Sequence, residues 1–142
     1  VRIPIVAAGG ISGGRAARAA LALGADAVQV GTAFLACEES GAATAHKRRL
    51  LDEREGRTVL SRAFTGRLAR YIPNAFIDQF EREPTQALPY PAQSWLTAPI
   101  KRAAGAASDL ENMALYAGQG VGLVRHRRAR EVMKELVAAL GG

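Results

Sequence analysis

The sequence predicts an α/β fold with parallel strands, and three observations in its first third support that prediction. Short apolar runs at residues 3–8 and 27–30 each end in glycine, as strands buried on both faces do where they meet a loop. A helical pattern lies between them, so the order is strand, helix, strand, a right-handed crossover. A complete eight-stranded barrel needs roughly 250 residues. A chain of 142 residues is therefore expected to hold the C-terminal part of a TIM (β/α)8 barrel.

The start of the chain points the same way. Val1 falls inside the first apolar run with no initiator methionine before it, so we expect the chain to have been cut from a longer protein. The helix between the two strands should run from Arg15 to Leu23. Ser12 is its expected N-cap, and Gly24 is the expected left-handed residue after its last turn.

The middle of the chain predicts one more helix and a β-hairpin. The helix should begin at about Glu38 or Ser40 and end near Leu51, before a charged segment. Residues 58–72 hold two β-prone runs around Thr65-Gly66, which is typical of a hairpin. We assign residues 1–73 to the barrel part on this basis.

Residues 74–142 are expected to form a mainly helical segment packed on the barrel. Ser108–Glu111 fits a capping box for a helix that runs toward Tyr116, with Gly118 ending it. A final helix should open within the basic cluster at 125–130 and continue beyond it. Its predicted apolar stripe contains Val132, Leu136, Val137 and Leu140.

Composition excludes several classes of protein. Hydrophobic residues make up 49% of the chain and charged residues 23%, the balance of a globular protein and not of a disordered tail. No stretch approaches the roughly 20 apolar residues of a membrane span, so no membrane contact is expected. The net charge of +6 is not arranged as a basic stripe interleaved with aromatic residues. No nucleic-acid partner is therefore expected.

The single cysteine, Cys37, cannot form an internal disulfide. Disulfides are rare in reducing compartments, so this favours the cytoplasm. A small packed side chain is the preferred interpretation of Cys37, and a reactive thiol is the weaker one.

Glycine follows both predicted strands. Gly9 and Gly10 come after the first strand, and Gly31 with Thr32 comes after the second. Glycine lets the main chain approach a ligand closely, so backbone N–H groups from both strand ends can point at one anion. The loops after the last two strands of such barrels commonly bind phosphate. We therefore predict a phosphate site here, in preference to glycines that only allow tight turns.

Gln29 lies on the second strand between Val28 and Val30. A buried amide at that position needs a polar partner. The pattern leaves two interpretations open: the side chain contacts the ligand, or it contacts another loop.

Several blocks of the sequence resemble the C-terminal part of nitronate monooxygenases, formerly called 2-nitropropane dioxygenases. They are AAGGISGG at 7–14, GADAVQVGTAFL at 24–35 and RAFTGRLAR at 62–70. The likeness continues through residues 38–41 and, more loosely, through LTAPIKRAA at 96–104 and ALYAGQG at 114–120. Several FMN-dependent barrels share the glycine blocks, whereas RAFTGRLAR and AGQG make the resemblance more specific.

The resemblance implies an FMN enzyme that oxidises alkyl nitronates with molecular oxygen to a carbonyl compound and nitrite. The flavin carries the chemistry in such an enzyme, and the protein supplies position and polarity. The implied cofactor-binding residues are Ala8, Gly9, Gly10, Gln29, Gly31 and Thr32. The family's catalytic histidine precedes the first block, so neither His46 nor His126 matches it, and no metal site is implied.

Two other functions remain open at this stage. An FMN-dependent enoyl-[acyl-carrier-protein] reductase of the same barrel type shares the glycine blocks but reduces a thioester with NAD(P)H. An inactive phosphate-binding fragment is the other, because a few barrel strands leave open edges that favour aggregation. For Arg67 and Arg70, an ordinary role on the exposed surface is the preferred interpretation, and contact at the mouth of the pocket is the weaker one.

Overall fold

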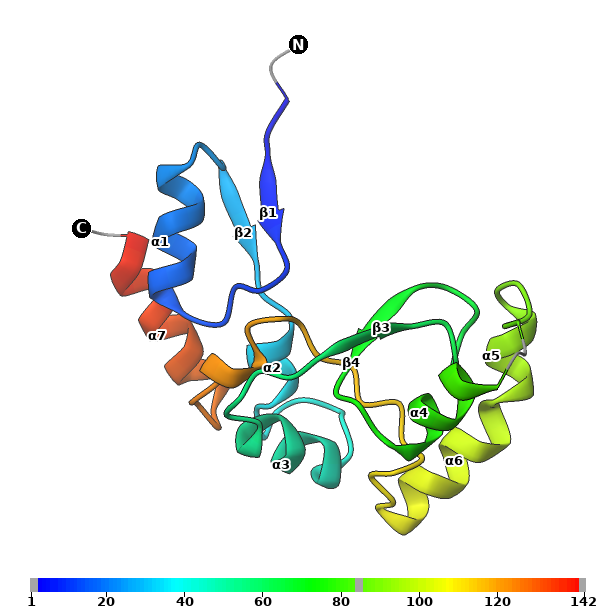
Figure 1. Ribbon diagram of the computed structural model, residues 1–142. Coiled ribbons are helices and arrows are strands. Elements are labelled where there is room, and N and C mark those ends of the chain that lie inside the picture. Colours follow the sequence, from blue (N-terminus) through cyan, green and yellow to red (C-terminus); the bar gives the residue numbers. More distant parts are fainter. Residues whose placement is uncertain (1–2, 84–85, 141–142) are drawn as a thin grey trace.

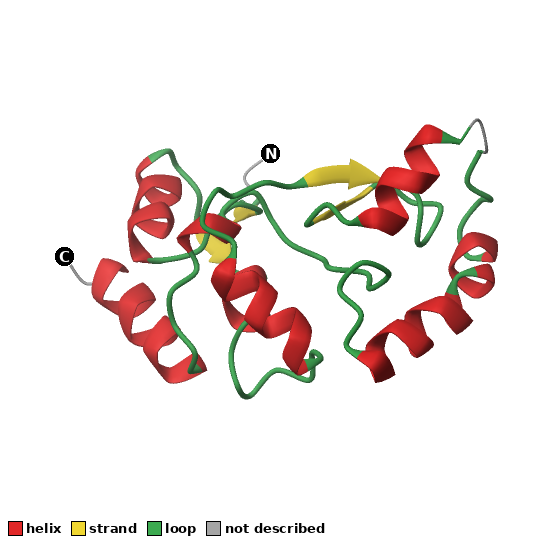
Figure 2. Cartoon of the chain, turned by 60° about the horizontal axis from the view of Figure 1, so that its bottom comes forward, coloured by secondary structure: helices red, strands yellow, loops and turns green. Residues whose placement is uncertain are grey.

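The computed structural model describes residues 3–83 and 86–140, so the expectations for Val1 and for the side chain of Leu140 lie outside the described residues. Figure 1 shows two groups of elements. The strand–helix–strand unit lies with α2 (Thr32–Leu35), α3 (Thr44–Asp52) and the last helix in what we call the barrel group. A β-hairpin lies with α4 (Ala75–Arg82), α5 (Ala92–Leu96) and α6 (Ala98–Ala107) in what we call the hairpin group. Figure 2 shows from another direction that both groups are built from helices, short strands and long connecting loops.

The predicted strand–helix–strand order is confirmed. Strand β1 (Val6–Ala8) pairs in parallel with β2 (Ala27–Gln29), with Ala7 opposite Val28, and α1 (Gly14–Ala22) connects them. The helix ends as predicted, because Gly24 has a φ of 101° and its N–H donates to the Leu21 carbonyl oxygen at 2.9 Å.

The expectation that both strands are buried on two faces is wrong for the described chain. Ala7 and Val28 point toward the helices and pack against the main hydrophobic core. Val6 is 55% exposed, and Ala27 and Gln29 on the same face are exposed as well. The reason is that no element among residues 3–83 and 86–140 covers that face of the two-stranded sheet.

Helix α1 does not use Ser12 as its N-cap. Gly13 occupies the cap position in an extended conformation, and Ser12 is buried. The N–H of Gly14 donates instead to Oε1 of Glu135, at 2.8 Å, from the far end of the chain. A carboxylate supplied by tertiary packing therefore takes the place of a local cap.

The helix expected from Glu38 or Ser40 begins later, and a shorter helix precedes it. Helix α2 (Thr32–Leu35) was not predicted, because four residues show no helical period. Helix α3 (Thr44–Asp52) buries Leu50 and Leu51 in the core. The turn between the two helices is fastened by Lys47, whose ammonium donates to the carbonyl oxygens of Glu38 and Ser40.

The predicted hairpin is confirmed. Strands β3 (Val59–Ser61) and β4 (Ala69–Tyr71) pair antiparallel and form a sheet of their own. A second core lies beneath them, and it contains Ala63, Phe64, Tyr71 and Ile77. Ile77 comes from helix α4 (Ala75–Arg82), which begins at Asn74, where the side-chain oxygen accepts the Ile77 N–H at 3.2 Å.

The predicted capping box at Ser108–Glu111 is wrong. Helices α5 (Ala92–Leu96) and α6 (Ala98–Ala107) come before it, and Ser108 ends α6 in the left-handed conformation. The Glu111 carboxylate accepts the N–H of Ala75 instead, at 2.9 Å. Tyr116 bridges to Tyr71 of β4, so Gly118 ends no helix, and a single 3-10 turn, η1 (Val121–Leu123), follows.

The last helix, α7 (Ala129–Leu140), returns to the barrel group and packs along α1 (Figure 1). It begins at Ala129, within the basic cluster at 125–130 as predicted, although near the end of that cluster. Val132, Leu136 and Ala139 face inward, whereas Val137 is 58% exposed, so the predicted stripe is wrong at that position. The domain boundary at residue 73 stays a prediction.

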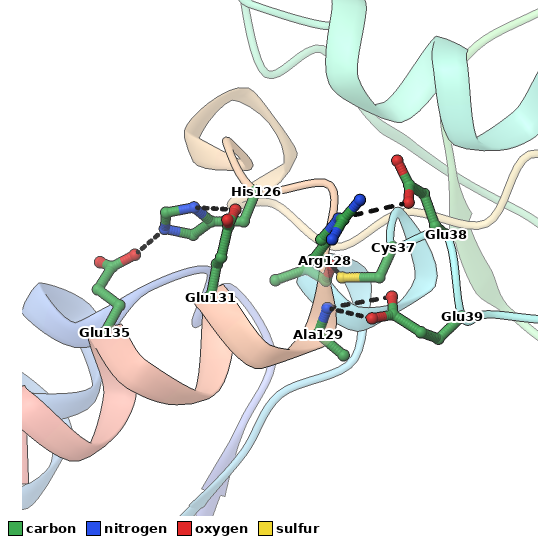
Figure 3. A network of polar contacts seen from close by, with 9 residues as sticks. Cys37, Glu38, Glu39, His126, Arg128, Ala129, Glu131 and Glu135 are labelled. Atoms are coloured by element: carbon green, nitrogen blue, oxygen red, sulfur yellow. Dashed lines mark hydrogen bonds and ion pairs between the residues drawn. The ribbon is translucent and has the colours of Figure 1, made fainter.

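Carboxylates make polar contacts at the start of α7 and further along it, as Figure 3 shows. At the start of the helix, Glu39 accepts the N–H of Ala129 at 3.1 and 3.2 Å. Further along the helix, Glu135 lies 2.8 Å from His126 Nε2, and the same carboxylate accepts the Gly14 N–H at the start of α1. The helix is therefore tied to α1 by polar contacts as well as by apolar packing.

We predict that Gly14→Ala destabilises the protein by about 1–3 kcal/mol, the usual cost of overpacking. A Cβ at this position would lie 2.5 Å from the Glu135 carbonyl oxygen and 2.8 Å from Ala139 Cβ. Urea denaturation measures the change. Gly105→Ala on α6 is the control, because its Cβ meets nothing within 4 Å. Alanine inside this helix should raise the free energy of unfolding by about 0.5–1 kcal/mol. Equal midpoints for Gly14→Ala and the parent protein would contradict the proposed packing of α7 on α1.

Candidate functional site

The six residues predicted to bind the cofactor lie together at the carboxyl ends of β1 and β2. They line one small cavity of about 180 Å³, which we call the glycine pocket. Ile11, Ser12 and Gly118 complete its lining. The lining residues predicted from the sequence are Ala8, Gly9, Gly10, Gln29, Gly31 and Thr32.

The backbone of the pocket needs glycine at two positions. Gly9 has a φ of 90° and Gly10 a φ of 73°, a region that other residues enter only at a cost. A Cβ at Gly9, Gly10 or Gly31 would meet no atom within 4 Å. The main chain therefore faces open space at all three positions.

Two of these glycines have main-chain amides without an acceptor: within residues 3–83 and 86–140, no acceptor takes the N–H of Gly10 or of Gly31. None of the described residues that line the pocket carries a charged side chain. Its polarity comes from main-chain dipoles and from the side chains of Ser12, Gln29 and Thr32, a combination suited to an anion whose oxygens accept several hydrogen bonds.

The Thr32 hydroxyl already accepts one hydrogen bond from the protein. Its oxygen accepts the N–H of Gly118 at 2.9 Å. A threonine hydroxyl can accept and donate at the same time, so its proton is left for a second partner. Thr32 is therefore arranged to act as a hydrogen-bond donor toward the pocket.

Gln29 differs from the expectation in its burial. Its side chain is exposed, because it lies on the uncovered face of β2, so the premise of a buried amide was wrong. It does line the glycine pocket beside Ala8, its partner across the sheet. Contact with a ligand stays a prediction.

Gly118 is the lining residue that sequence reasoning missed most clearly. The sequence pattern predicted that this residue ends a helix, and only the tertiary fold places it beside Thr32 and Gly10. The available signal was the second glycine two positions later, since a pair of glycines outside a turn indicates close backbone approach.

Neither histidine lines the pocket. His46 is buried on α3, and its Nε2 donates to the Tyr116 carbonyl oxygen at 3.0 Å. Burial lowers the pKa of His46 below its ordinary value, because the charged imidazolium loses hydration. His126 precedes α7, and its ring lies between the carboxylates of Glu131 and Glu135 on that helix.

Cys37 is a packed residue, as expected. It is 1% exposed, and its thiol donates to the Ala33 carbonyl oxygen at 3.2 Å. Burial, with a further contribution from the nearby Glu39 carboxylate, raises the pKa of the thiol. These surroundings disfavour a reactive thiolate.

Arg67 and Arg70 lie in the hairpin group, away from the glycine pocket. The Arg67 guanidinium stacks over the Tyr90 ring, 4.2 Å from its centroid, beside a wider surface hollow of about 780 Å³. Arg70 donates to the Thr58 hydroxyl at 3.1 Å. The wider hollow contains none of the predicted cofactor-binding residues, so we place the candidate site at the smaller glycine pocket.

The described residues contain neither a metal-binding cluster nor a membrane-spanning helix. Residues 3–83 and 86–140 contain no group of three or more His, Cys, Asp or Glu side chains able to hold a metal ion. Within the same residues, no helix combines the length and the apolar character needed to cross a bilayer.

Comparison with known proteins identifies the family. The family model described as nitronate monooxygenase matches residues 1–140. The chain belongs to the nitronate monooxygenase family. This is a family of flavoprotein oxidoreductases with the TIM-barrel fold, and the α/β architecture of this chain is consistent with part of such a barrel.

The chain is similar to proteins from several bacteria. It is 43% identical over 119 residues to a probable nitronate monooxygenase of Bacillus subtilis, covering 84% of this chain and 34% of that protein. It is 37% identical over 137 residues to one of Staphylococcus aureus, covering 96% of this chain and 39% of that protein.

Two solved structures are similar to the chain. Nitroalkane oxidase from Streptomyces ansochromogenes superimposes with a TM-score of 0.89 at 49% identity, covering 99% of this chain and 40% of that one. FabK from Thermotoga maritima gives a TM-score of 0.79 at 31% identity, covering 98% of this chain and 44% of that one. The chain thus spans less than half the length of the proteins it matches.

We predict that the free energy of unfolding falls as the pH drops below about 6.5, partly because of His46. The folded state keeps this imidazole neutral, since burial lowers its pKa, whereas the unfolded chain takes up a proton near the ordinary value. His46→Gln keeps a donor for the Tyr116 carbonyl oxygen but does not titrate. Urea midpoints measured between about pH 7.5 and about pH 5 should fall less in this variant, and an unchanged slope would contradict the assignment.

Proposed function

We propose that this chain holds the phosphate of FMN in an enzyme that oxidises alkyl nitronates with molecular oxygen to a carbonyl compound and nitrite. The observation that supports it is the glycine pocket: two adjacent parallel strand ends present unobstructed main-chain amides to one small space. Membership of the nitronate monooxygenase family supplies the reaction type.

The pocket residues fit a phosphate group. A phosphate monoester is a dianion with three oxygens that accept hydrogen bonds, so it needs several donors converging on one point. Gly10 and Gly31 offer N–H groups that no described residue accepts, and the Thr32 hydroxyl offers a third donor. The loops after neighbouring strands bind phosphate in many TIM barrels.

The bound flavin would accept electrons from the substrate and pass them to oxygen. The residues of this chain would hold its phosphate end and leave the ring to other parts of the barrel. His46 is excluded as a base toward the pocket, because its Nε2 is engaged with Tyr116 inside the core. We expect the catalytic histidine in the barrel segment that precedes the AAGGISGG block in this family.

Gly31→Val is expected to abolish retention of FMN in the full-length protein that carries these residues. Gly31 has a negative φ of −109°, and its Cβ would meet no protein atom, so valine should fold normally while filling the space of the phosphate. Flavin content of the purified protein, read from the visible spectrum, measures the effect.

The matched control is Gly41→Val, since Gly41 is exposed and its Cβ also meets nothing within 4 Å. Gly10→Val should lose flavin as well, although its φ of 73° adds backbone strain that Gly31 does not share. Normal flavin content in Gly31→Val would place the phosphate elsewhere.

The likeness to FabK, at lower identity than the nitroalkane oxidase, keeps reduction of an enoyl thioester by NAD(P)H as a second candidate. Steady-state assays of the full-length protein separate the two. With propionate 3-nitronate as substrate, we expect the protein to release nitrite and to consume oxygen. Oxidation of NAD(P)H that depends on an enoyl thioester, without nitrite from the nitronate, would favour the reductase.

Residues 1–142 expressed alone are expected to aggregate and to bind FMN poorly. Ile3 and Ile5 beside β1 are 69% and 57% exposed, on a sheet with uncovered strand edges. Size-exclusion chromatography and a visible spectrum test this. A yellow monomer with stoichiometric FMN would show that these residues suffice for the site.

A further inference from the structure

A segment of chain joins the hairpin group to the glycine pocket. We call residues 115–120 the strap; it runs beside β4 and then crosses to the barrel group (Figure 1). The Ile72 N–H donates to the Leu115 carbonyl oxygen at 2.9 Å, and the Ala117 N–H donates to that of Arg70 at 3.2 Å. This half of the strap therefore pairs with β4 as an extra edge.

The other half of the strap reaches the pocket. Gly118 donates its N–H to Thr32 Oγ1 at 2.9 Å, and it lines the cavity itself. Gly120 packs against the loop after β1 so closely that a Cβ there would overlap the Gly10 carbonyl oxygen and lie 2.6 Å from Ser12 Oγ. Main-chain contact at both glycines thus connects the strap to the two loops that form the pocket.

We propose that the strap is a third wall of the phosphate site, with Gly118 as a further residue of that site, and that phosphate binding fastens the hairpin group to the barrel group. This inference rests on the proposed FMN site. It adds a residue from outside the two strand-end loops and a route by which cofactor binding orders a distant part of the chain.

Two distances explain why residue 118 has no side chain. A Cβ there would lie 3.2 Å from Thr32 Oγ1 and 3.6 Å from the Gly10 nitrogen. A phosphate oxygen that accepts from Thr32 and from Gly10 must lie within about 2.7–3.0 Å of the same two atoms. A methyl group at residue 118 would therefore crowd both atoms that a phosphate oxygen must approach.

The route to the hairpin group is short and made of hydrogen bonds. Phosphate bound by the Thr32 hydroxyl favours the rotamer that also accepts the Gly118 N–H, which holds the strap in place. His46 supports the middle of the strap through the Tyr116 carbonyl oxygen. The pairing of Ala117 with Arg70 then carries the restraint to β4.

The test compares FMN with riboflavin, which has the same ring and ribityl chain but no phosphate. In the full-length protein, Gly118→Ala should weaken FMN binding by at least about tenfold, the value of roughly one charge-assisted hydrogen bond. Riboflavin binding should stay within about twofold. Gly105→Ala is the control, since its Cβ meets nothing within 4 Å.

Thr32→Val provides a second variant if Gly118→Ala does not fold. It removes the acceptor of the Gly118 N–H together with the donor to phosphate, so it should show the same selective loss for FMN. Thr32→Ser should restore most of the affinity.

Hydrogen exchange of the Ala117 and Ile72 amides provides the readout for coupling. At an FMN concentration of 100 times Kd, exchange should slow by up to about 100-fold, because opening the strap then requires release of the phosphate. Riboflavin at the same multiple of its own Kd should leave these two amides unchanged.

The outcomes separate the two proposals. If the parent protein binds FMN no better than riboflavin, both the phosphate site and the strap inference fail. If the parent prefers FMN but Gly118→Ala keeps that preference in full, the glycine pocket stands and the third wall is overturned. Equal slowing of exchange by FMN and riboflavin would overturn the coupling.

Discussion

The glycine pocket depends on one constraint: main-chain atoms from three separate parts of the sequence must approach one another without side chains between them. Gly10 belongs to the loop after β1, Gly31 to the end of β2, and Gly118 to the strap. Each contributes backbone to one cavity that contains no cationic side chain. An anion held there would be bound by oriented dipoles, which are fixed by the fold before the ligand arrives and need no charged residue nearby.

The two glycine pairs in AAGGISGG illustrate how similar sequence features serve different purposes. Gly9 and Gly10 have positive φ values and face open space. Gly13 and Gly14 face α7 so closely that a Cβ on either would collide with Glu135. The first pair leaves room for a ligand, whereas the second leaves room for another helix. Sequence inspection distinguishes them only by position relative to the strand.

Local signals were sufficient wherever the structure is determined by neighbours in the sequence. The parallel unit, the turn at Gly24 and the hairpin around Thr65-Gly66 could all be predicted from such signals. The family resemblance completed the set of six predicted residues that line the glycine pocket. The errors occur where a distant partner decides. Glu135 replaces Ser12 at the start of α1, and Glu111 contacts the start of α4 instead of capping a helix of its own. Gly118 lines the same cavity as Thr32, although the two residues are 86 positions apart in the sequence.

The hydrogen bond between Gly14 and Glu135 spans 121 residues of sequence. A nascent chain leaving the ribosome would present the loop after β1 long before the carboxylate that completes the first helix has been made. Contacts between such distant positions form late, because a long stretch of chain must be closed to make them. The start of α1 thus receives this hydrogen-bond acceptor only after α7 has been added.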